Sequence, residues 1–260
     1  MNTLLSQITP SRSFNLTFVL IDIAFLLVLV TLLLYKRRYQ TCLFGLFGGI
    51  LYTIVDYCGF YLLAHSREIY LSGELADPLM TFWVLLWMSM SYGFTNFAFI
   101  WLCLSKDKYL ALWLSLIVGW WLVAPSIASL GGEATIFTTR TTNEYHGIMG
   151  VFLAVSYLAL IALMLIKRRQ FVNILLLNLI GISVQFGWEF ALLINGIRPM
   201  NELSIQTLLV NSFMETNLGM PAILGIFYLV RKKKDEDLKP SSGQFGILRI
   251  LREEENLTGE

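Results

Sequence analysis

Seven long apolar runs, separated by short polar segments, dominate the sequence. A helix needs about 20 predominantly apolar residues to cross the hydrocarbon core of a bilayer, and each run reaches that length. Soluble domains carry about 25% charged residues, whereas this chain carries 14%. We therefore predict an all-α polytopic membrane bundle of seven transmembrane helices at Phe14–Tyr35, Thr41–His65, Pro78–Cys103, Lys108–Leu130, His146–Ile166, Phe171–Ile194 and Leu203–Val230.

The distribution of basic residues predicts how the bundle is oriented. Of the 19 Lys and Arg residues, 15 lie in the tail or in the segments that follow the first, third, fifth and seventh runs. The other four, on the opposite side, are Arg12, Arg67, Arg140 and Arg198. Basic residues concentrate on the cytoplasmic side of membrane proteins, so we predict the N-terminus outside, the C-terminus inside and location in the cell membrane. Residues 1–230 then form the seven-helix domain, and residues 231–260 form a charged cytoplasmic tail.

Four acidic residues lie inside the predicted spans, and no Lys or Arg lies within a span to pair with them: Asp22, Asp56, Glu189 and Glu215. An Asp at a helix centre costs roughly 2.5–3.5 kcal/mol on insertion scales. The predicted orientation places all four in the outer half of the bundle. For Asp22 we favour a packing role in a helix interface. For Asp56, Glu189 and Glu215 we predict shared protons or a bound cation in a partly hydrated cavity.

Polar residues at helical spacing accompany these acids and are predicted to line the same cavity. Together with the three acids, the predicted substrate-binding set contains Tyr52, Gln185, Tyr92, Asn96, Asn211 and Asn217. Three tryptophans, Trp87, Trp120 and Trp188, lie deep enough to contribute to its walls. The chain has no P-loop, no HExxH and no paired cysteines, so we expect no cofactor and no metal. The expected partners are the lipid bilayer and a small-molecule or lipophilic substrate. A net charge of +1 gives no reason to expect nucleic acid.

The first and last three spans share features that suggest an internal repeat. Aligning Gly48 with Gly181 places Asp56 opposite Glu189. The third and seventh spans carry SYGFTN (91–96) and SFMETN (212–217), which share Ser, Thr and Asn in register. This pattern is typical of a parallel 3+1+3 arrangement, in which the fourth span connects the halves and a binding site lies between them.

This layout resembles that of the SWEET and PQ-loop solute carriers. In those carriers an asparagine of the third span faces one of the seventh, positions that Asn96 and Asn217 would take here. The resemblance implies transport of a small solute. The sequence departs from the family in lacking its Pro-Gln signature.

The layout also resembles that of the small integral-membrane terpene cyclases. They have seven spans, a short basic loop after the first, an acid in the second and an acid in the seventh, places that Asp56 and Glu215 occupy. The resemblance implies that one of these acids protonates a polyprenyl substrate while aromatic walls shield the carbocation. Here the family's Trp-Glu pair occurs in the sixth span instead, as Trp188 and Glu189.

Three functions therefore remain open. The first is a solute carrier coupled to protons or cations through Asp56, Glu189 and Glu215, which the repeat favours narrowly. The second is an intramembrane enzyme that uses one of the same acids as proton donor. The third is a structural or signalling subunit whose acids bind a basic residue of a partner helix.

Overall fold

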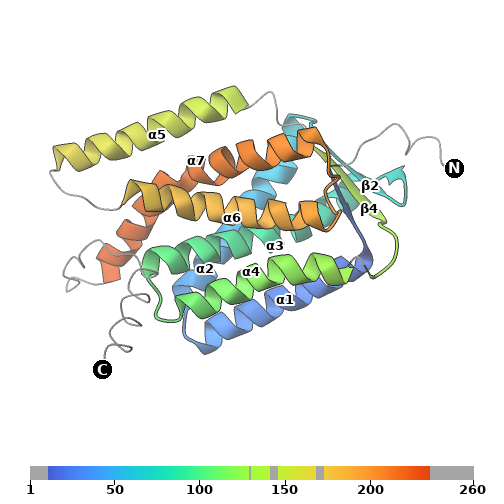
Figure 1. Ribbon diagram of the computed structural model, residues 1–260, viewed down its shortest axis with the longest axis horizontal. Coiled ribbons are helices and arrows are strands. Elements are labelled where there is room, and N and C mark those ends of the chain that lie inside the picture. Colours follow the sequence, from blue (N-terminus) through green and yellow to red (C-terminus); the bar gives the residue numbers. More distant parts are fainter. Residues whose placement is uncertain (1–10, 129, 141–145, 168–172, 235–260) are drawn as a thin grey trace.

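A computed structural model describes residues 11–128, 130–140, 146–167 and 173–234, and these form a bundle of long helices with a small sheet at one end (Figure 1). Each predicted span corresponds to a helix within a few residues. The helices are α1 (Leu16–Tyr35), α2 (Tyr39–Thr53), which continues as the π-helix η2 (Ile54–Leu63), α3 (Pro78–Ser105), α4 (Leu110–Ala128), α5 (His146–Ile166), α6 (Ile174–Ile194) and α7 (Glu202–Lys234).

Six of these helical segments are long and apolar enough to cross a membrane, which makes the chain an integral, multi-pass membrane protein. The exception is α3, where polar residues such as Ser89, Ser91 and Asn96 lower the hydropathy and most side chains are buried by neighbouring helices. The count of seven spans and the orientation stay predictions. Helix α7 continues to Lys234, and the rest of the predicted tail lies outside the described residues.

Helix α3 lies in the middle of the bundle, and small residues allow its closest neighbour to approach. A Cβ atom added to Gly93 would lie 2.8 Å from the carbonyl oxygen of Gly48 on α2. Helices α6 and α7 meet in a similar way, because a Cβ atom added to Gly181 would lie 2.1 Å from Oδ1 of Asn217. Close backbone approach at small residues is the usual basis of helix packing in membranes. Helix α5 packs chiefly against α7 at the side of the bundle (Figure 1).

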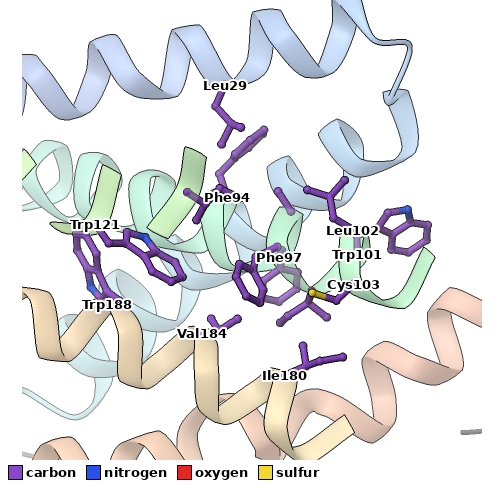
Figure 2. Close-up of a cluster of buried hydrophobic side chains, with 14 of the residues drawn as sticks. Leu29, Phe94, Phe97, Trp101, Leu102, Cys103, Trp121, Ile180, Val184 and Trp188 are labelled. Carbon is purple, nitrogen blue, oxygen red and sulfur yellow. The ribbon is translucent and has the colours of Figure 1, made fainter. Parts of the chain in front are cut away.

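Aromatic side chains fill the space between α3 and its neighbours. Figure 2 shows Phe94, Phe97 and Trp101 of α3 within a cluster of buried side chains. Phe97 and Trp101 both pack against Phe44 of α2, with ring centroids 5.1 and 4.6 Å apart. Phe99 of α3 stacks on Trp121 of α4 with ring centroids 5.8 Å apart. The core is therefore built around α3, although this helix also buries polar residues such as Ser89 and Asn96.

The sheet was not predicted, and it corrects the expectation of a purely helical chain. It contains β1 (Arg12–Phe14), β2 (Arg67–Leu71), β3 (Glu74–Leu75) and β4 (Ile136–Arg140), in the order β1-β4-β2-β3 with antiparallel pairing. Its strands come from three separate segments between or before the helices. We call this end of the bundle the sheet end (Figure 1).

Candidate functional site

Two of the acids that the sequence left without basic partners are paired with arginines. Oδ1 of Asp56 lies 3.6 Å from Nη1 of Arg67. Glu189 pairs with two arginines, accepting from Nη2 of Arg12 and lying 2.7 Å from Nη2 of Arg198. The prediction that Asp56 and Glu189 lack counter-ions is therefore wrong. It failed because all three arginines lie outside the spans in sequence, and the strands and the α6–α7 turn fold back over the helix ends.

Asp56 is enclosed by donors on both carboxylate oxygens. It is the buried residue of η2, and Ser89 and Tyr92 of α3 both donate to its Oδ2, Ser89 at 3.0 Å. Arg67, from β2, occupies the side of Oδ1. A buried charge is tolerated when it is paired and hydrogen-bonded. Asp56 thus ties the sheet to two helices.

Glu189 occupies the corresponding place on α6, between β1 and the α6–α7 turn. Burial lowers the pKa of the Arg198 guanidinium, the attraction of Glu189 raises it, and the nearby charge of Arg12 lowers it again. Glu215 on α7 also attracts Arg198. Its carboxylate accepts from Nε2 of Gln185 at 2.9 Å, so the polar groups of α6 and α7 are joined.

Arg12 connects the two groups of ion pairs. Its guanidinium carbon lies 5.9 Å from the ring centroid of Tyr92, whose hydroxyl donates to Asp56. A cation over an aromatic face is attracted by the ring quadrupole. We call this set the arginine–carboxylate layer; it consists of Arg12, Arg67, Arg198, Asp56 and Glu189.

Asp22 is the intramembrane acid that differs most from the others. It is 1% exposed and accepts from the indole Nε1 of Trp87 at 3.0 Å and of Trp120 at 3.4 Å. The Ser91 hydroxyl is its third hydrogen-bond partner. Among the residues that the structure describes, no Lys or Arg forms an ion pair with Asp22. Every donor to Asp22 is a neutral side chain.

Asp22 borders a small cavity that we call the Asp22 cavity. Its volume is about 10 Å³, and a single water molecule needs about that much. Five of the nine residues that line it are aromatic, Phe14, Phe18, Trp87, Tyr92 and Trp188; the others are Arg12, Asp22, Met88 and Ser91. Nε1 of Trp188 is buried and has no hydrogen-bond partner among the described residues. At its volume, the cavity has room for a water molecule and not for a larger solute.

The other predicted binding residues do not converge on this cavity as a group. Tyr52 lies beside Tyr92 with ring centroids 5.0 Å apart, and Asn211 hydrogen-bonds His146 at 3.2 Å. Asn217 donates to the Phe213 carbonyl, and Oδ1 of Asn96 is buried without a hydrogen-bond partner. Among the described residues, no hydrogen bond joins Asn96 to Asn217, the pair expected from the resemblance to carriers. Within the described ranges, no group of three His, Cys, Asp or Glu side chains could hold a metal ion.

Sequence reasoning overlooked Asp22 and the three arginines as site residues. The sequence contained features that could have indicated both Asp22 and the arginines. Trp87 and Trp120, which were expected to line a cavity, are the donors to Asp22. Arg67 lies a few residues after the end of the helix that carries Asp56, and Arg198 lies a few residues after the end of the helix that carries Glu189.

The fold and these buried polar groups define the class: an integral, multi-pass helical membrane protein with a charged network buried beneath a small sheet. Comparisons with protein-family models, with curated proteins and with solved structures found no match to this chain.

Proposed function

We propose that the protein is an intramembrane enzyme that isomerises or cyclises an apolar, unsaturated substrate by acid catalysis, with Asp22 as the proton donor. One observation carries this proposal: a buried acid, whose hydrogen-bond donors among the described residues are neutral, borders a cavity lined mostly by aromatic side chains. A general acid must reach its substrate in the protonated form. Asp22 fits this role better than Asp56 and Glu189, which are ion-paired with arginines.

The surrounding side chains suit each stage of such a reaction. Transfer of the Asp22 proton to a carbon–carbon double bond forms one C–H bond and leaves a cation on the adjacent carbon. The aromatic faces of the Asp22 cavity stabilise positive charge. The indole N–H groups of Trp87 and Trp120 stabilise the carboxylate that remains. Loss of a proton from a neighbouring carbon back to this carboxylate completes an isomerisation without any co-reactant.

The arginine–carboxylate layer would keep water away from the cation. Arg12 and Arg67 come from strands of the sheet and are bonded to acids within the bundle. These ion pairs hold the sheet over the helix ends. Exclusion of water prevents hydrolysis of a reactive intermediate. On this proposal Asp56 and Glu189 position the sheet rather than donate a proton.

The test is product formation by purified protein in lipid nanodiscs. Incubation with prenylated and other unsaturated lipid extracts, followed by liquid chromatography and mass spectrometry, should reveal a product of unchanged mass. Asp22→Asn keeps a hydrogen-bond acceptor but removes the acidic proton, so we expect at least a 100-fold loss of rate. Glu133→Gln changes an exposed acid of the same chain and should leave the rate unaltered. Full activity of Asp22→Asn would disprove the proposed role.

A solute carrier is the second candidate, and a specific observation favours it. The two acids that the sequence aligned, Asp56 and Glu189, each pair with an arginine that follows the same helix, Arg67 and Arg198 respectively. Such duplication supports a 3+1+3 repeat, which is typical of carriers. Flux of a polar solute into proteoliposomes, with no chemical product, would favour the carrier over the enzyme. The subunit interpretation loses its main argument, because these two acids have basic partners within the chain.

A further inference from the structure

A second cavity lies at the sheet end, between the start of α1 and the ends of α4 and α6. Its volume is about 130 Å³, and we call it the vestibule. Gly132 and Gly196 at its rim are exposed, so it opens at the surface of the protein. Its lining combines apolar residues, including Pro125, Ala128 and Ile197, with the polar residues Ser13, Asn15 and Asn195, and none of the described residues that line it is charged.

The vestibule and the Asp22 cavity share two walls. Phe14 and Phe18 line both of them. The two rings stack with centroids 5.3 Å apart, and the edge of Trp87 packs against Phe14 at 5.2 Å. Phe18 is 1% exposed. These two rings therefore stand between an open space and the buried acid.

The backbone around the two rings is held in place by Asn15. Its Oδ1 accepts from the Phe18 amide at 2.9 Å, which caps the first turn of α1. Its Nδ2 donates to the carbonyl oxygens of Ala128 and Gly132, at 2.7 and 3.1 Å. Because these hydrogen bonds fasten the start of α1 to the end of α4, a passage between the two cavities would require rotation of side chains rather than movement of the backbone.

We propose that the vestibule is the entry site for an uncharged ligand, and that this ligand displaces the rings of Phe14 and Phe18 to reach Asp22. Two observations point to a ligand beyond the rings: the shared wall, and Trp188, a residue of the Asp22 cavity whose buried indole Nε1 has no hydrogen-bond partner among the described residues. The absence of charge in the vestibule sets the class of ligand. The identity of the ligand as a substrate rests on the proposed function, whereas the entry route does not.

Thiol labelling tests the route without any substrate. In a variant with Cys42, Cys58 and Cys103 replaced by serine, Ser91→Cys places a single thiol on the wall of the Asp22 cavity. We expect methyl methanethiosulfonate, a small uncharged reagent, to label it slowly. Phe18→Ala should accelerate labelling at least tenfold by joining the two cavities. Phe18→Leu, a milder change, should accelerate it less and serves if the alanine variant does not fold.

Two further variants distinguish labelling through the vestibule from labelling caused by a general loss of packing. Leu29→Ala shortens a fully buried side chain on the same helix that lines neither cavity, and should not accelerate labelling. Ala134→Trp fills the vestibule and should slow labelling in the Phe18→Ala background. Equal acceleration by Leu29→Ala, or no effect of Ala134→Trp, would overturn the proposed route. Faster labelling of the Phe18→Ala variant, together with no product from the unaltered protein in the nanodisc assay, would instead leave the route standing and refute the proposed enzyme.

Discussion

At the scale of single residues, the buried charges nearly balance. Three arginines, Arg12, Arg67 and Arg198, lie among the four intramembrane acids, so a neutral set requires one proton on an acid. Low-dielectric surroundings favour neutrality, because an uncompensated buried charge is costly. Asp22, which has no arginine partner among the described residues, is the natural place for that proton. The charge balance and the hydrogen bonds thus support the same proton donor.

Glu189 is the acid whose removal should harm stability most. Glu189→Gln would remove the carboxylate with which two mostly buried arginine side chains, those of Arg12 and Arg198, form ion pairs. Removing one partner of a buried ion pair costs about 3–5 kcal/mol. We expect a loss of about 3 kcal/mol or more, seen as a clearly lower temperature of unfolding in detergent. Glu133→Gln, at an exposed site, should unfold as the parent does. An unchanged unfolding temperature for Glu189→Gln would show that the pairs contribute little.

At the scale of helices and strands, contact between α6 and α7 depends on the absence of a side chain at one position. Gly181→Ala would bring a Cβ atom to 2.1 Å from Oδ1 of Asn217. Because Asn217 is buried and bonded to the Phe213 carbonyl, it cannot simply turn away. Overpacking of this kind costs about 1–3 kcal/mol. Gly119→Ala on α4 provides the matched control, since nothing lies within 4 Å of its added Cβ atom. Thermal unfolding that is equal for the two variants would contradict this account of the packing.

The elements also show what sequence reasoning could and could not predict. The long apolar runs predicted the helices within a few residues. A membrane helix makes its backbone hydrogen bonds within its own segment, so its position can be predicted from that segment alone. The strands were missed because β1, β2 and β4 are short segments that pair only across the folded chain. The same pairing carries Arg12 and Arg67 over the acids. The partners of Asp56 and Glu189 were therefore invisible to a search confined to the spans.

At the scale of the whole molecule, the two ends of the bundle use their basic residues differently. At the sheet end, Arg12, Arg67 and Arg198 are buried and neutralised by acids. Among the described residues, these three arginines are held in buried ion pairs at the sheet end; at the opposite end Arg38 is also paired, with Asp107, while Lys36 and Lys108 lie at the surface. The orientation stays a prediction that rests on the count of basic residues.

The sheet end should face the outside, because exposed basic residues are retained in the cytoplasm. In a cysteine-free variant, Glu133→Cys places a thiol at an exposed position of the sheet end, and Lys108→Cys places one at the opposite end. We expect a membrane-impermeant maleimide to label Glu133→Cys on intact cells, and Lys108→Cys only after the cells are permeabilised. The reverse pattern would show that the sheet end faces the cytoplasm. The vestibule would then open toward the cytoplasm, and an uncharged ligand would reach Asp22 from that side.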